Sequence, residues 1–247
     1  MRESYLAGAY WGCRPESAEA CARRAETFFR LMAECHPSYV RWYEQAKSTK
    51  QALQLQFEPT QDTFMRFFSK KKYQSGRDGF YFSAWTGHVK QEEGGMLMLF
   101  CGSAAKVAPN NLILHFPTEE LGEERMLTAS VTAGVMRALA VAWEPDWALV
   151  TGDDGLWKEL SRHDEADTFV GWMTYISHRW GGADIPPLPE PVRVEPIGDQ
   201  GSLITLTPER LTITRPDHVA LGHGVQRLLE ERGIFKPLIE RRPPPVG

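Results

Sequence analysis

The sequence lacks any apolar run of about 18 residues or more, which excludes a membrane-spanning helix among its 247 residues. Its four cysteines form no C-x-x-C pair and are too few for a disulfide framework, so free thiols are expected. The 21 glycines and 17 prolines lie well below the level of low-complexity chains. The first residues show no secretion signal, and the chain is therefore predicted to be cytoplasmic.

The common catalytic motifs are missing as well. There is no Walker phosphate loop, no G-x-S-x-G nucleophile elbow and no H-E-x-x-H zinc motif. Gly222-His-Gly224 lacks the third glycine and the preceding strand of a dinucleotide fingerprint. His218 and His223, five positions apart on a predicted helix, point about 140° away from each other, which argues against a shared metal ion. These absences exclude the common enzyme classes and leave uncommon ones open.

What is present is typical of one globular domain, with 42% hydrophobic and 24% charged residues. Apolar residues at helical spacing predict helices from residue 16 to 35, from 38 to 47, after Pro59, from 128 to 143 and from 216. Alternating or apolar runs predict strands at residues 4–10, 80–85, 96–101, 112–116, 147–151, 168–177, 192–195, 202–206 and 211–213. Because Met96–Cys101 and Leu112–Phe116 are continuously apolar, they are predicted to be central strands covered on both faces.

These elements predict an α+β fold in which a mixed or antiparallel sheet packs with several helices. The proline-rich connector 185–191 is a candidate domain boundary, but the segment after it is too small to fold alone. We therefore expect a single domain over residues 1–240, with the connector inside it. Residues 241–247, which include three consecutive prolines, are expected to form a mobile tail.

Charge is unevenly distributed along the chain. The net charge is −4, but residues 119–167 hold twelve acids and four bases, a net charge of −8. Such a sector disfavours binding to nucleic acid and favours a basic partner. Trp157, next to several of these acids, is a candidate aromatic anchor inside a charged rim, and the alternative is an ordinary core contact. Most of the eight tryptophans are expected to lie in the core.

Two local arrangements keep an enzymatic alternative open. Cys101 at the end of a predicted strand, with His115 on the next strand, could form a nucleophile–base pair. The simpler interpretation is a buried cysteine and a histidine at a strand edge. Asp153 and Asp154 follow another predicted strand and could hold magnesium or act as acid and base. The simpler interpretation there is a turn that caps the next helix.

Four aromatic segments occur in a specific order. They are Tyr10-Trp11-Gly12 followed by Arg14-Pro-Glu-Ser17, then Phe80-x-Phe-Ser-x-Trp85-x-Gly87, Trp143-Glu-Pro-Asp-Trp147, and Gly171-Trp-Met-Thr-Tyr-Ile-Ser177 before a proline stretch. Together, over about residues 5 to 206, they resemble the immunity protein fifty-two family of bacterial polymorphic-toxin systems. Glu144 departs from the aspartate expected at that position of the family motif.

The resemblance implies a cytoplasmic α+β protein without catalysis or cofactor, which binds the toxin domain encoded beside its own gene and blocks the active site or substrate groove. Toxins linked to the family are often nucleases of restriction-endonuclease fold delivered by contact-dependent secretion, such as the type VI system. The expected partner is thus a cognate toxin, with no direct contact to nucleic acid or membrane. A secretion chaperone for the toxin is a further alternative.

An acidic protein can occupy the basic groove of a nuclease as a decoy for phosphates. The candidate toxin-binding residues are therefore ten acids of the −8 sector together with Trp157: Glu119, Glu120, Glu123, Glu124, Asp153, Asp154, Trp157, Glu159, Asp164, Glu165 and Asp167. No catalytic or metal-binding residue is implied by the resemblance.

Overall fold

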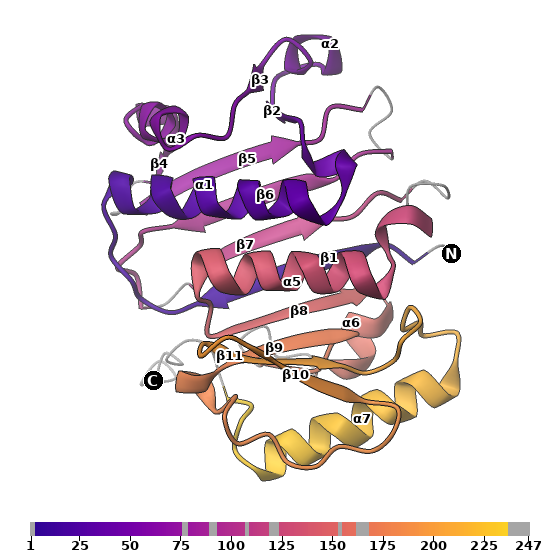
Figure 1. The fold of residues 1–247 in the computed structure, drawn as a ribbon. Helices are drawn as coiled ribbons and strands as arrows, with labels where there is room; N and C mark the ends of the chain where they lie inside the picture. The colour runs from indigo at the N-terminus through magenta and orange to yellow at the C-terminus, as the bar shows by residue number, and fades with distance from the viewer. Residues whose placement is uncertain are drawn as a thin grey trace, which may run out of the picture.

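The protein folds around a single large β-sheet (Figure 1). The structure is a computed structural model that describes residues 3–75, 79–88, 93–106, 109–118, 124–152, 155–161 and 168–236. Within these residues eleven strands pair, all of them antiparallel, in the order β10-β11-β9-β8-β1-β7-β6-β5-β2-β3, and β4 lies beside β5. The predicted α+β class is confirmed.

The sheet mixes early and late parts of the chain. Strand β1, the first, lies at its centre between β7 and β8, and the strands that follow the proline-rich connector extend the same sheet. The strands are β1 (Tyr5–Trp11), β2 (Trp42–Glu44), β3 (Gln56–Phe57), β4 (Gln74–Ser75), β5 (Gly79–Trp85), β6 (Met96–Cys101), β7 (Asn110–His115), β8 (Trp147–Gly152), β9 (Met173–Ser177), β10 (Arg193–Ile197) and β11 (Gly201–Thr205).

Within the described residues six helices accompany the sheet, and α1, α3, α5 and α7 among them form where the apolar spacing predicts helices. They are α1 (Ala18–Cys35), α2 (Thr49–Ala52), α3 (Gln61–Phe68), α5 (Ala129–Trp143), α6 (Gly155–Leu160) and α7 (Pro216–Glu231). The hydroxyls of Ser17 and Thr128 accept the first free backbone N–H groups of α1 and α5, as N-cap side chains do. These two helices pack side by side across one face of the sheet (Figure 1).

Two predicted elements are wrong. Instead of a helix over residues 38–47, a short 3₁₀ turn (Pro37–Tyr39) leads into β2, because the aromatic residues there pair with other strands: Trp42 with Phe57, and Tyr43 with Trp85. Residues 211–213 form no strand. Their backbone bonds go to side chains instead, since Tyr5 donates to the Leu211 carbonyl and the Thr212 amide donates to His218 Nδ1.

One half of the sheet is buried on both faces. Every residue of β8 and β9 is buried, as are four of the five residues of β11. Helix α5 packs on one face of these strands. On the other face Phe169 packs on Trp147, α6 contacts both β8 and α7, and Gln226 of α7 accepts a hydrogen bond from the Val170 amide. We call β8, β9 and β11 the covered half.

The other half is buried on one face only. In β6 and β7 buried and partly exposed residues alternate strictly, and β5 shows the same alternation with small deviations. The prediction that residues 96–101 and 112–116 are covered on both faces is therefore wrong. We call β7, β6, β5 and β2 the open half; β1 lies between the two halves.

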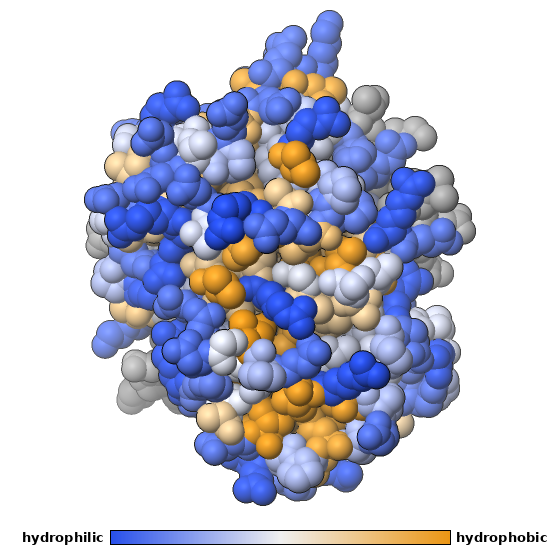
Figure 2. Space-filling model, viewed as in Figure 1, coloured by the Kyte–Doolittle hydropathy of each residue, from blue (hydrophilic) through white to orange (hydrophobic). Residues whose placement is uncertain are grey.

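The face beneath α1 and α5 carries the core of the open half. Leu97 and Leu99 of β6 and Leu112 and Leu114 of β7 are buried there. Figure 2 shows this helix-bearing side, where hydrophilic side chains prevail and apolar ones emerge in separate patches. The opposite face of the open half is unusual, because apolar side chains stay partly exposed on it.

Candidate functional site

The outward face of the open half and of the adjoining strand β1 forms three rows of side chains across the strands. Strand pairing aligns Leu6, His115, Met96, Trp85 and Tyr43 in the first row; Ile113, Met98 and Ser83 in the second; and Tyr10, Asn111, Phe100 and Tyr81 in the third. We call these twelve residues the open face. Because side chains alternate along a strand, all twelve point away from α1 and α5.

The open face is apolar although most of its side chains are partly exposed. No Asp, Glu, Lys or Arg belongs to it, and ten of its twelve residues are aliphatic, aromatic, histidine or methionine side chains. Tyr81 is 45% exposed, and ten of the other eleven are partly exposed. Exposed apolar patches of this kind mark interaction sites, and aromatic and methionine side chains are enriched in protein interfaces.

The size of the open face suits part of a protein interface. Five neighbouring strands about 4.8 Å apart, with outward residues about 6.8 Å apart along each strand, give a surface about 20 Å wide and 14 Å or more long. A stable complex buries about 800 Å² on each partner. The open face therefore supplies the centre of such an interface, and its rim must supply the remainder.

Local packing fixes the shape of the open face at its first row. The rings of Tyr43 and Trp85 lie 6.2 Å apart. Gly87 has a φ of +79°, and a Cβ at this position would lie 2.1 Å from the Tyr43 ring, so glycine is required on both counts. This packing explains the spacing between Trp85 and Gly87 in the second aromatic motif.

The aromatic motifs at residues 10–12 and 143–147 are far apart in the sequence but meet at the C-terminal end of α5. Trp11 stacks on Trp143 with ring centroids 5.5 Å apart, and the Gly12 amide donates to Asp146 Oδ2 over 3.0 Å. Tyr10 stacks on Trp147. These contacts join β1 to the turn between α5 and β8, so these motifs stabilise the fold rather than forming a reactive site.

Three arginines cap the C-terminal carbonyls of α5 in the same region, which we call the corner between the two halves. Arg24 donates to Ala142 O, Arg14 to Trp143 O and Arg179 to Glu144 O, over 3.0, 2.7 and 2.7 Å. Positive charge at this end of a helix is stabilised by the helix dipole. Burial lowers the pKa of Arg14 from its ordinary value, while Glu16, 3.3 Å away, acts in the opposite direction.

Most of the sequence-predicted toxin-binding residues cannot be placed. Outside the described residues lie Glu119, Glu120, Glu123, Asp153, Asp154, Asp164, Glu165 and Asp167. Strand β7 precedes the acids at 119–123, and strand β8 precedes Asp153 and Asp154. The ends of these two strands lie close together, because the Phe116 amide donates to the Tyr5 carbonyl and Gly152 pairs with Tyr5. An acidic binding surface stays a prediction.

The three described members of that set are separate side chains on the surface. Glu124 is exposed, and Trp157 on α6 is 37% exposed. Glu159 Oε1 lies 3.4 Å from His223 Nε2 of α7. Five of the eight tryptophans are buried, as expected: Trp11, Trp42, Trp143, Trp147 and Trp172.

The proposed Cys101–His115 pair is wrong. Strands β6 and β7 are antiparallel with Met96 opposite His115, so Cys101 lies about 17 Å further along the sheet. The two side chains also point to opposite faces, since Cys101 is fully buried and His115 belongs to the open face. Burial raises the pKa of the Cys101 thiol well above its ordinary value, which opposes nucleophilic attack.

The Asp153–Asp154 alternative stays a prediction, and the two histidines of α7 have different partners. Asp153 and Asp154 lie outside the described residues. His218 is buried and accepts from the Thr212 amide, whereas His223 is half exposed and faces Glu159. Within the described ranges, no group of three histidine, cysteine or acidic side chains is arranged to hold a metal ion.

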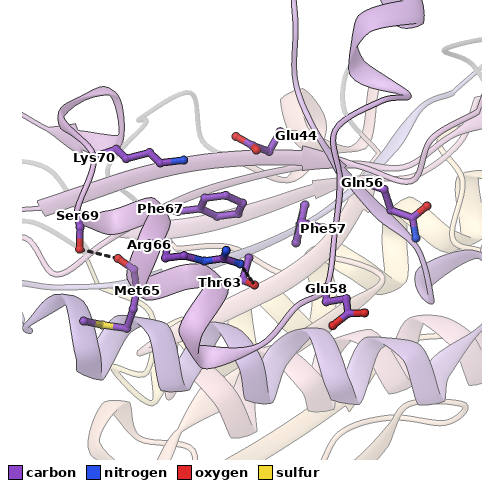
Figure 3. Close-up of a pocket in the computed structure, with 10 residues that line it drawn as sticks. All are labelled: Glu44, Gln56, Phe57, Glu58, Thr63, Met65, Arg66, Phe67, Ser69 and Lys70. Atoms are coloured by element: carbon purple, nitrogen blue, oxygen red, sulfur yellow. Dashed lines mark hydrogen bonds between the residues drawn. The ribbon is translucent and has the colours of Figure 1, made fainter.

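A hollow of about 730 Å³ lies between β3 and α3 (Figure 3). Its charged side chains already contact the protein: Arg66 donates to Thr63 Oγ1, Lys70 lies over the Phe67 ring, and Glu44 pairs with Lys72. Figure 3 shows Phe57 and Phe67 between these groups. The arrangement contains no nucleophile–base pair, and it does not suggest a catalytic site.

Comparisons with known proteins agree with a binding role. A family model described as immunity protein 52 matches residues 3–238, nearly the whole chain. The solved structure of the Pseudomonas aeruginosa T6SS protein PA0821 is similar in fold, with a TM-score of 0.50, 14% sequence identity, and coverage of 92% of this chain and 76% of that one. A search with the sequence finds no match among curated proteins. In the described part of the chain, every helix is too short or too polar to cross a bilayer.

Proposed function

Since this chain belongs to the immunity protein 52 family, we propose that it binds a cognate toxin through the open face and thereby neutralises it. The observation that carries the proposal is the open face itself: a broad, uncharged, aromatic and methionine-rich sheet surface that the described residues leave partly exposed. A protein partner that covers this surface removes it from water, which is the main driving force of association.

The chemistry of the open face defines how the partner is held. Trp85, Tyr81 and Phe100 offer large rigid side chains of the kind that dominate binding energy in interfaces. Met96 and Met98 lie among them, and their flexible thioethers adapt to the shape of the partner. The open face therefore acts as the central, dry part of the interface, while charged residues belong to its rim.

The finer parts of the proposal rest on the resemblance of the aromatic motifs. We propose that the toxin is a nuclease of restriction-endonuclease fold, that this chain blocks its active site or substrate groove without catalysis of its own, and that the complex forms in the cytoplasm. We also propose that acids of residues 119–167 contact the basic groove of the nuclease. The similar fold of a Pseudomonas aeruginosa T6SS protein supports delivery by type VI secretion.

The proposal is tested with a charge placed on the open face. Met98→Arg is expected to weaken toxin binding at least 100-fold, because the guanidinium must be desolvated without a partner. Val141→Arg on α5, an apolar residue that is 43% exposed, is the matched control and should bind within about twofold of the parent. Affinity is measured with the toxin domain encoded by the neighbouring gene, together with survival of host cells that co-express it.

The result that would contradict the proposal is clear from the same pair of variants. If folded Met98→Arg protects cells and binds the toxin as the parent does, the open face is not the toxin-binding surface. If the parent chain itself fails to protect, the immunity function is wrong.

A second candidate function is favoured by the apolar character of the open face. A secretion chaperone also needs an extended apolar surface, with which it holds its client before export. The two functions differ in their effect on the folded toxin. A chaperone binds an unfolded or N-terminal segment and leaves the activity of the purified toxin domain unchanged, whereas an immunity protein abolishes that activity at a one-to-one ratio.

A further inference from the structure

The centre of the open face is an apolar strand. Met96, Met98 and Phe100 are the outward residues of β6, and all three are partly exposed. Ile113 of β7 lies opposite Met98 and is partly exposed as well. The backbone of β6 is paired on both sides, with β5 and with β7. We call Met96, Met98, Phe100 and Ile113 the apolar centre.

No acidic or basic residue of the open face accompanies the apolar centre. None of the twelve residues is Asp, Glu, Lys or Arg. Ser83, opposite Met98 on β5, already donates its hydroxyl to Gln45 Oε1. Glu44 follows an outward residue of β2 and therefore points to the opposite face, where it pairs with Lys72. A charged side chain of a partner that faces the apolar centre thus loses its water and gains no ion pair.

The catalytic groove of a nuclease has the opposite character. It holds acidic side chains that bind divalent metal ions and basic side chains that bind phosphates. If the apolar centre covered such a groove, these charges would be desolvated without partners, which opposes association. An apolar surface is the better complement, because the complex then removes two apolar surfaces from water.

We propose that the apolar centre docks on an uncharged, apolar patch of the toxin that lies beside its catalytic groove and contains none of its catalytic residues. This inference rests on the proposed immunity function and specifies which part of the toxin is held. The volume of the bound chain closes the groove to a long nucleic acid, while the charged catalytic side chains of the toxin do not contact the apolar centre. Residues outside the open face stay free to contact the groove.

Double-mutant cycles with the toxin domain encoded by the neighbouring gene test this assignment. Met98→Ala and Phe100→Ala are each expected to weaken binding about tenfold, chiefly through faster dissociation. Each exposed residue of the toxin is changed to Ala and measured against the parent chain and against both variants. Apolar and aromatic toxin residues should couple with these variants, whereas every Asp, Glu, Lys and Arg of the toxin, the catalytic ones included, should act additively.

Val141→Ala is the matched control, since Val141 is apolar and 43% exposed but lies on α5, on the other side of the sheet. It should bind within about twofold of the parent and couple to no toxin residue. Toxin variants that lack a catalytic side chain should bind the parent chain within about twofold of the active toxin. Coupling of Met98→Ala or Phe100→Ala to a charged toxin residue, or to no residue, overturns the inference.

These outcomes are distinguishable from failure of the proposed function. If Met98→Arg abolishes binding and Met98→Ala couples to a catalytic acid of the toxin, the open face is the docking surface and only the position beside the groove is wrong. If Met98→Arg binds as the parent does, the docking surface itself is wrong. Thermal unfolding of each variant shows whether the fold is retained.

Discussion

Ile113 and Ile176 point to the same face of one continuous sheet, yet Ile113 is partly exposed and Ile176 is completely buried. Ile113 belongs to β7 in the open half, and Ile176 to β9 in the covered half. The amino acid and its orientation are the same, so the difference lies in what covers the side chain. The covered half is closed by later parts of its own chain, whereas the open half presents similar apolar residues to its surroundings.

This comparison shows how one fold can separate stability from binding. Apolar residues of the covered half contribute to the free energy of unfolding, because burial by the protein itself removes them from water on folding. Apolar residues of the open face contribute less to folding, because part of their surface stays exposed, and that part can be buried when a partner binds. Substitutions at the matched isoleucines, at the corner between the halves and within the covered half test whether stability and binding respond separately.

The largest difference is expected for a charge introduced at the two isoleucines. Ile176→Arg places an unpaired guanidinium in the covered half and should abolish folding, because a buried charge without a partner is strongly destabilising. Ile113→Arg should fold with a melting temperature close to that of the parent and lose toxin binding by at least 100-fold. Circular dichroism and binding measurements check both. Equal destabilisation by the two variants would remove the distinction between the halves.

A smaller difference is expected for truncation at the same positions. Ile176→Ala should lower the free energy of unfolding by about 2–5 kcal/mol, as removal of a buried side chain leaves a cavity. Ile113→Ala should lower it by less than about 1 kcal/mol and weaken toxin binding instead. Urea unfolding and titration with the toxin give the two numbers for each variant. A loss of stability of 2 kcal/mol or more in Ile113→Ala would contradict the comparison.

A smaller loss of stability is expected from one substitution at the C-terminal end of α5, where Arg14 caps the helix. Arg14→Lys is expected to lower the free energy of unfolding by about 1–2 kcal/mol, because one ammonium cannot bond both Trp143 O and Glu144 O as the guanidinium does. Toxin affinity should stay within about twofold, since this corner does not belong to the open face. Chemical denaturation measures the first quantity. A large loss of affinity with unchanged stability would extend the binding surface to the corner.

The smallest effect is a dependence of stability on alkaline pH. Burial raises the pKa of Tyr175 in the covered half to about 12. Between about pH 10 and 12 the unfolded chain loses this proton while the native protein retains it, so the free energy of unfolding falls as pH rises. Tyr175→Phe should reduce that slope by about one proton. Unfolding free energies at several pH values measure it, and identical slopes in parent and variant would show that Tyr175 does not contribute.

The family, the α+β class and most individual elements follow from the sequence, because they depend on local patterns. The apolar spacing of residues 18–35 and 129–143 and the caps at Ser17 and Thr128 predict α1 and α5 almost to the residue. The strand at Phe80–Trp85 and the ordered aromatic motifs are equally local. The residues of the candidate site were missed, although the motif around Ser83 and Trp85 contained part of the signal.

Only the tertiary structure decided which apolar residues are covered. A continuous apolar strand has the same sequence whether its second face is buried by its own chain or left for a partner, since periodicity reports orientation and not the neighbouring layer. The pairing of Trp11 with Trp143, and of Tyr43 with Trp85 over Gly87, likewise joins residues too far apart for any local pattern. The sequence determined what each strand is made of, and long-range packing determined which of its faces remains available for binding.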